Sequence, residues 1–117
     1  MTAYCTLYDV KKRLQIEVGD VTYDPELEDI IVEAQAVMDS DLSQYDIGTP
    51  LSTVPGLLKY ACADLVASIF KSRRSKPEAH GEDLALNFRK AYESKLAAYG
   101  NVNSTLLPFV VGTVDEE

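Results

Sequence analysis

Residues 54–70 read VPGLLKYACADLVASIF, and this stretch decides the fold. Only Lys59, Asp64 and Ser68 are clearly polar in it, so apolar side chains fall on nearly every face of a helix built from it. A helix that is apolar on all sides is buried among other elements. The sequence therefore predicts a central helix over about residues 54–72.

Both ends of this helix carry boundary signals. Thr53 is a good N-cap residue, and Pro55 is tolerated in a first helical turn. The following residues, 71–77, read KSRRSKP. Their cations suit the negative end of a helix, and Pro77 opposes its continuation.

A second helix is predicted over about residues 25–44. Apolar residues recur there at the spacing of one helix face, and they are Leu27, Ile30, Ile31, Ala34, Met38 and Leu42. Carboxylates take the other faces, namely Glu28, Asp29, Glu33, Asp39 and Asp41. Asp24 before Pro25 is the expected cap. Turn-forming residues make 45–54 a loop.

A short first helix is predicted over about residues 6–15. Thr6 can cap it, and Asp9 three residues later favours the positive helix end. Gly19 and Asp20 are expected to end it.

A last helix is predicted over about residues 81–99, with Gly100 as its C-terminal stop. Its apolar stripe consists of Leu84, Phe88, Ala91, Tyr92, Leu96 and Tyr99. The fold class is therefore all-α, a bundle of three to four helices. Residues 1–100 form the helical domain, and residues 101–117 form an extended C-terminal tail.

The tail contains an apolar, β-favouring run beyond the last helix: Leu106, Leu107, Phe109, Val110 and Val111. These residues can either fold back onto their own bundle or dock to a partner chain. We favour docking to a partner, and Pro108 is compatible with both arrangements.

Composition limits the classes of function. The 117 residues fit one domain, and their net charge of -8 repels nucleic-acid phosphates and anionic membranes. Cys5 and Cys62 lack metal-site or redox-motif spacing, so we expect both to be reduced thiols in a cytoplasmic setting. No stretch has the length of apolar residues that a membrane span needs, and the N-terminus does not resemble a secretion signal.

Sequence motifs for catalysis are missing. The chain has no phosphate-binding loop, nucleophile elbow or zinc-protease motif, and its single histidine, His80, lies in a predicted loop without suitable neighbours. We therefore expect neither an enzyme, a metal site nor a cofactor. A small enzyme with a tyrosine-rich pocket is the weaker alternative.

One basic cluster has three possible interpretations, and it consists of Lys71, Arg73, Arg74 and Lys76. We favour the interpretation that these cations complement the negative end of the central helix. The cluster could instead bind phosphates, which gives an alternative function as a small helical nucleic-acid-binding regulatory protein. A third option is pairing with the acidic face of a neighbouring subunit.

The order of segments resembles the small head–tail connector proteins of tailed bacteriophages, also called adaptor or head completion proteins. The segments that carry the resemblance are YCTLYDVKKRLQI (4–16), PELEDIIVEAQAVMDSDL (25–42), VPGLLKYACADLVASIF (54–70) and LALNFRKAYESKLAAYG (84–100). Together they span most of the chain, although none is a catalytic signature.

The resemblance implies a virion structural protein at the head–tail interface, assembled in the host cytoplasm and acting without chemistry or cofactor. Its partners would be the portal protein, a stopper or tail-side protein, and further copies of itself in a ring, commonly dodecameric, through which DNA passes without specific binding. The free protein could be monomeric. The family's C-terminal segment commonly engages the portal, which would assign that role to Leu106–Val111.

Overall fold

The computed structural model describes residues 3–49, 51, 53–74 and 81–103, which form four α-helices with no β-strand among them. The helices are α1 (Leu7–Leu14), α2 (Asp24–Ser43), α3 (Gly56–Arg74) and α4 (Gly81–Asn103). The predicted all-α class is confirmed.

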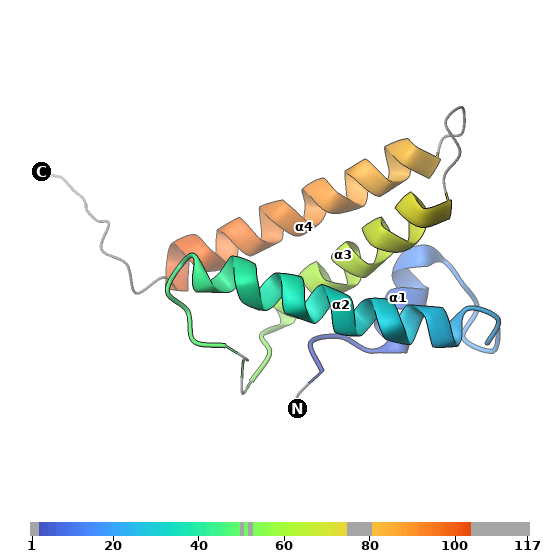
Figure 1. The fold of residues 1–117 in the computed structure, drawn as a ribbon, viewed down its shortest axis with the longest axis horizontal. Helices are drawn as coiled ribbons and strands as arrows, with labels where there is room; N and C mark the ends of the chain where they lie inside the picture. The colour runs from blue at the N-terminus through green and yellow to red at the C-terminus, as the bar shows by residue number, and fades with distance from the viewer. Residues whose placement is uncertain (1–2, 50, 52, 75–80, 104–117) are drawn as a thin grey trace, which may run out of the picture.

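Helix α3 lies at the centre of the bundle and packs against the other three helices (Figure 1). Helix α2 lies nearest the viewer in this view, α4 runs along the upper edge, and α1 lies behind α2. The buried residues of α3 are Leu58, Ala61, Cys62, Ala63, Asp64, Leu65, Val66, Ala67, Ser68 and Phe70. The central position predicted for this helix is confirmed.

The apolar stripe of α2 is also confirmed, because all six of its predicted members are buried. The carboxylates of α2 divide into two groups. Glu28, Asp29 and Glu33 are exposed. Asp39 and Asp41 are half-buried, and they accept hydrogen bonds from the hydroxyls of Tyr4 and Tyr92.

Helix α1 covers the predicted range of about 6–15, but the residue that ends it is not the one expected. Thr6 and Asp9 form a reciprocal capping box, in which the Asp9 amide donates to Thr6 Oγ1 over 3.2 Å. The expected end at Gly19 and Asp20 is wrong, because Gln15 already adopts a left-handed conformation (φ 62°). The Ile16 amide then donates to the Lys11 carbonyl over 2.8 Å, which closes the helix while Ile16 packs against the core.

Asp24 does not cap α2, which corrects the prediction. Tyr23 occupies the N-cap position without a side-chain cap bond, and Asp24 is the first helical residue. Its Oδ1 lies 2.7 Å from Nζ of Lys11, a lysine that is almost fully buried. A buried ammonium needs a charged or hydrogen-bonding partner, and Asp24 supplies it.

Thr53 is not the N-cap of α3 either, because the helix begins at Gly56. The Lys59 amide donates to the Pro55 carbonyl over 3.0 Å, as expected for a first helical turn. A residue before proline avoids helical dihedral angles, so Val54 prevents an earlier start.

Gly100 was expected to end the last helix, and this is wrong. Helix α4 continues to Asn103, with Gly100 buried inside it. A Cβ atom on Gly100 would lie 2.7 Å from the Tyr45 ring, so the missing side chain provides the space for that ring. This glycine serves close packing between α4 and the loop after α2.

Candidate protein-interaction surface

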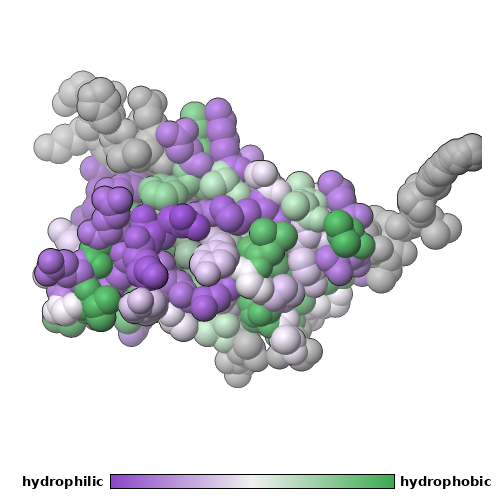
Figure 2. All heavy atoms as spheres, turned by 180° about the vertical axis from the view of Figure 1, so that it is seen from behind, coloured by the Kyte–Doolittle hydropathy of each residue, from purple (hydrophilic) through white to green (hydrophobic). Residues whose placement is uncertain are grey.

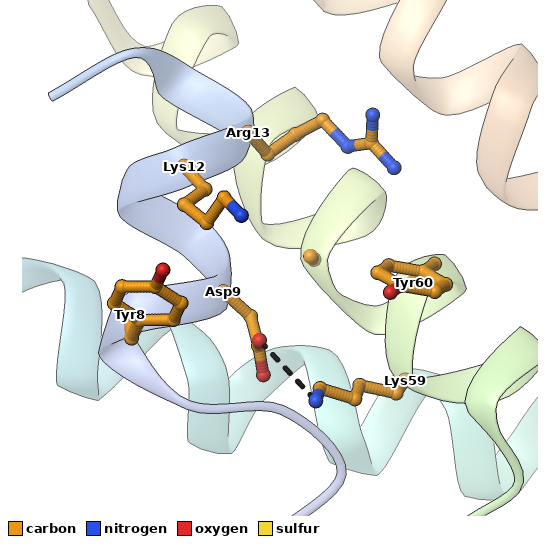
Figure 3. Close-up of a pocket in the computed structure, with 7 residues that line it drawn as sticks. Tyr8, Asp9, Lys12, Arg13, Lys59 and Tyr60 are labelled. Atoms are coloured by element: carbon orange, nitrogen blue, oxygen red, sulfur yellow. Dashed lines mark ion pairs between the residues drawn. The ribbon is translucent and has the colours of Figure 1, made fainter.

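Helices α1 and α3 enclose an open hollow of about 300 Å³ on the side of the bundle away from α2 (Figure 3). We call it the α1–α3 hollow, and its lining residues are Tyr8, Asp9, Lys12, Arg13, Lys59, Tyr60 and Ala63. Tyr8 and Tyr60 stand on opposite sides of it, and they are 53% and 52% exposed. Half-exposed tyrosines beside cations are typical of protein interfaces.

The hollow has an excess of positive charge. The carboxylate among its described lining residues, Asp9, lies 3.5 Å from Nζ of Lys59. Lys12 lies 5.4 Å from the centre of the Tyr8 ring, and among the described residues no carboxylate is within ion-pair distance of it. An exposed ammonium without an ion-pair partner favours an anionic partner.

Arg13 is held in place by a buried carboxylate. Asp64 is 1% exposed, and its Oδ1 lies 2.7 Å from Nε of Arg13. Its other oxygen lies 2.5 Å from Nζ of Lys95, so one side chain of α3 joins α1 to α4. The sequence showed Asp64 only as a polar interruption, although a lone carboxylate in an apolar helix is a signal for buried ion pairing.

The segment before α1 is anchored by buried polar contacts. The Tyr4 hydroxyl donates to Asp39 and accepts from the Leu51 amide over 2.8 Å. Burial, followed by the hydrogen bond to Asp39, raises the pKa of Tyr4 to about 12. The Cys5 and Cys62 sulfurs are 2.9 Å apart as free thiols, and their hydrogen bond and burial raise the pKa of Cys62. These contacts fix the chain entering α1.

The two arginines of the basic cluster face their own chain. Nη2 of Arg73 lies 2.7 Å from Oε1 of Glu33, and Arg74 pairs with Glu26, so both arginines contact α2. Arg74 also lies over the Phe70 ring, 4.5 Å from its centre. The intramolecular pairs agree with a structural role, while phosphate binding and inter-subunit pairing stay predictions.

Several predicted positions lie outside the residues that the structure describes. They are Lys76, His80 and the proposed docking residues Leu106, Leu107, Phe109, Val110 and Val111. Lys71 is described, and it lines a small hollow that also contains Arg13 and Phe88. The docking role of Leu106–Val111 therefore rests on the sequence alone.

Helix α2 presents the opposite side of the bundle to solvent. Six of its exposed positions follow one face and form what we call the α2 stripe: Pro25, Glu28, Asp29, Val32, Ala36 and Ser40. Glu33 and Ser43 are exposed as well. Val32 is 69% exposed. Among the described residues no cation lies within ion-pair distance of Glu28 or Asp29, whereas Glu26 and Glu33 are paired with arginines. The stripe is thus acidic with an apolar centre.

The side of the bundle opposite to α2 has a mixed surface (Figure 2). Hydrophilic residues cover much of this face, and separate hydrophobic patches interrupt them. In the described ranges, no cluster of three histidine, cysteine or acidic side chains is arranged to hold a metal ion. Nor does any helix described by the structure have the length and apolar character of a bilayer span.

Comparison with known proteins identifies a family. The family model described as "Bacteriophage Mu, Gp36" matches residues 4–106, which include all four helices. No curated protein and no solved structure matches the chain.

Proposed function

The chain belongs to the bacteriophage Mu Gp36 family, and from this premise we propose that it is a structural protein of the virion. It acts as a head–tail connector subunit that forms a ring between the portal and the stopper or tail-side proteins. The ring continues the channel through which DNA passes. It acts by contact between proteins and not by catalysis.

The observation that carries this proposal is the match to a phage family over all four helices. The order of segments that resembles connector proteins lies within the same residues. The architecture fits an adaptor, since the buried Asp64 links three helices into one rigid body. Two exposed surfaces of opposite charge, the α1–α3 hollow and the α2 stripe, leave that body able to contact neighbours.

The C-terminal run Leu106–Val111 supplies the contact with the portal in this proposal, on the grounds of its sequence alone. A short apolar segment with β-branched residues is suited to adding backbone and side-chain contacts to a partner's surface. The net charge of -8 supports the channel role, because an acidic lining does not retain DNA.

The test is reconstitution with the portal of the same phage. The purified chain is mixed with assembled portal, and the complex is measured by multi-angle light scattering and native mass spectrometry. We expect saturable binding of one connector per portal subunit, in a dodecameric ring if the portal is dodecameric. A folded chain that never binds the portal would contradict the proposal.

A further inference from the structure

We propose that the α1–α3 hollow of one copy receives the α2 stripe of a second copy of this chain. This inference rests on the proposed ring, and it specifies which two surfaces form the contact between neighbouring subunits. It names the occupant of the hollow as another connector subunit and not as the portal, a nucleic acid or a small ligand.

Charge complementarity is the first argument. Lys12 and Lys59 bring positive charge to the hollow, and Asp9 is the only carboxylate among its described lining residues. On α2, Glu28 and Asp29 are exposed, and among the described residues they have no cationic partner. Each surface carries the charge that the other needs, which favours encounter and fixes register.

Apolar complementarity is the second argument. Val32 follows Glu28 by one helical turn, so the valine and the carboxylate share one face of α2. In the hollow, the Tyr8 and Tyr60 rings lie to either side of the lysines (Figure 3). An exposed helix with a valine between carboxylates and small residues suits a groove between two helices with aromatic walls.

The arginines of the basic cluster already form ion pairs within their own chain. Arg73 and Arg74 already pair with Glu33 and Glu26, which lie on the side of α2 that borders α3. Asp29 lies one helical turn from each of these glutamates, whereas Glu28 and Val32 lie farther round the helix from them. The basic cluster after α3 is therefore a poorer candidate for the neighbour's acidic face than the α1–α3 hollow.

The relative placement of the two surfaces is the third argument. Helix α2 lies on the front of the bundle, and α1 lies behind it (Figure 1). A contact between different surfaces on opposite sides of a subunit is head-to-tail, and repetition of such a contact closes a ring when the rotation angle allows it. A two-fold dimer would instead use the same surface twice.

Charge reversal tests this contact. We expect Lys12→Glu alone, or Glu28→Lys with Asp29→Lys, to weaken association between subunits about tenfold or more, because like charges then face each other. An equimolar mixture of the two variants, and the variant that carries all three substitutions, should recover association. Lys90→Glu makes the same charge change on α4 and should leave association at the wild-type level. Circular dichroism checks that each variant is folded.

The readouts are light scattering of the free chain over a range of concentrations and the number of copies bound per portal ring. Carbodiimide coupling of equal amounts of ¹⁵N-labelled and unlabelled chain adds a direct readout. It should join Lys12 or Lys59 of one copy to Glu28 or Asp29 of another, and mass spectrometry identifies mixed-isotope peptides. The wild-type chain could form a ring only on the portal. If fewer copies of each single-surface variant than of wild type then bind per portal ring, the proposed contact is supported.

The outcomes separate this inference from the proposed function. If the Lys12 variant and the α2 variant both bind the portal with the wild-type copy number, the proposed contact between subunits is wrong and the connector function stands. If Lys12→Glu weakens binding of the first copy while the α2 variant behaves as wild type, the hollow binds the portal, which also overturns the contact. If the wild-type chain does not bind the portal, the connector function fails. In that case, self-association of the free chain tests the proposed contact between subunits. A chain that stays monomeric at every concentration overturns this contact.

Discussion

Asp64 Oδ2 lies 2.5 Å from Nζ of Lys95, and the same carboxylate contacts Arg13 through its other oxygen. The carboxylate is almost completely inaccessible to solvent, whereas both cations are partly exposed. One side chain in the middle of the central helix therefore links the first and last helices of the bundle.

Asp64→Asn should lower the free energy of unfolding by about 1–3 kcal/mol, because a neutral amide cannot replace the carboxylate in its ion pairs with Arg13 and Lys95. Partial exposure of Arg13 and Lys95 keeps the loss at this level, since water can rehydrate both cations. Urea denaturation measures it. Glu93→Gln, which removes the exposed Arg89 pair, is the control and should change stability by about 0.5 kcal/mol or less. Equal stability of Asp64→Asn and wild type would show that Asp64 is not a structural link.

Gly100→Ala should destabilise the protein by about 1–3 kcal/mol, although alanine is the better helix former, because its Cβ would overlap the Tyr45 ring. The double variant Gly100→Ala with Tyr45→Ala removes the overlap and should cost less than the sum of the two single changes. Gly56→Ala is the matched control, since nothing lies within 4 Å of its Cβ position. Additive effects of the two substitutions would mean that no overlap exists.

The sequence predicted the helices well where one physical signal dominated. The apolar face of α2 and the all-apolar α3 follow directly from burial, so their residues were correctly placed. Two of the errors, at Asp24 and Gly100, arose where a distant partner overrode a local rule. Asp24 neutralises Lys11, and Gly100 accommodates Tyr45. Neither partner can be found from neighbouring residues.

The interaction surface was predictable only in part. The acidic exterior of α2 was visible from its periodicity. The α1–α3 hollow was not, because its residues come from two helices whose relative position depends on packing. Lys59 and Asp64 appeared in the sequence as mere interruptions of an apolar helix, yet one lines the hollow and the other fixes its Arg13.

High pH should destabilise the fold through Tyr4. Its pKa is raised from 10.0 to about 12 in the folded protein, so the folded state keeps this proton more tightly than the unfolded state does. The stabilisation is therefore complete below pH 10 and is lost as the pH rises through about 12. Phenolate absorbance and circular dichroism, recorded together during an alkaline titration, should show Tyr4 ionising as the helices unfold. Tyr8→Phe, which removes an exposed phenol, should leave the unfolding pH unchanged. Ionisation of every tyrosine before any loss of helix would contradict this.

Removal of residues 104–117 should leave a folded helical protein that no longer binds the portal, because the proposed docking residues are lost. Circular dichroism measures the fold, and sedimentation with portal measures binding. Leu107→Asp with Phe109→Asp should have the same effect in the full-length chain. Loss of the helical fold on truncation would mean instead that the tail belongs to the core of its own subunit.

Duplex DNA should bind weakly at low salt, with an affinity that does not depend on the basic cluster. Arg73 and Arg74 already pair with Glu33 and Glu26, and the net charge of the chain opposes DNA. The comparison is wild type against a variant with Lys71, Arg73, Arg74 and Lys76 all changed to Gln, measured by fluorescence anisotropy across a salt series. Salt-sensitive binding that disappears in the variant would favour the alternative role as a nucleic-acid-binding regulator.

The contact between Gly100 and Tyr45 has a mechanical consequence. If a load on the C-terminal end of α4 pulls along the helix axis, the Tyr45 ring packed at Gly100 opposes sliding at that end. Farther along α4, Tyr92 and Lys95 connect the helix to Asp41 of α2 and Asp64 of α3. Tension on a chain attached through its C-terminus would thus be shared as shear by three helices, and would not peel away the last helix alone.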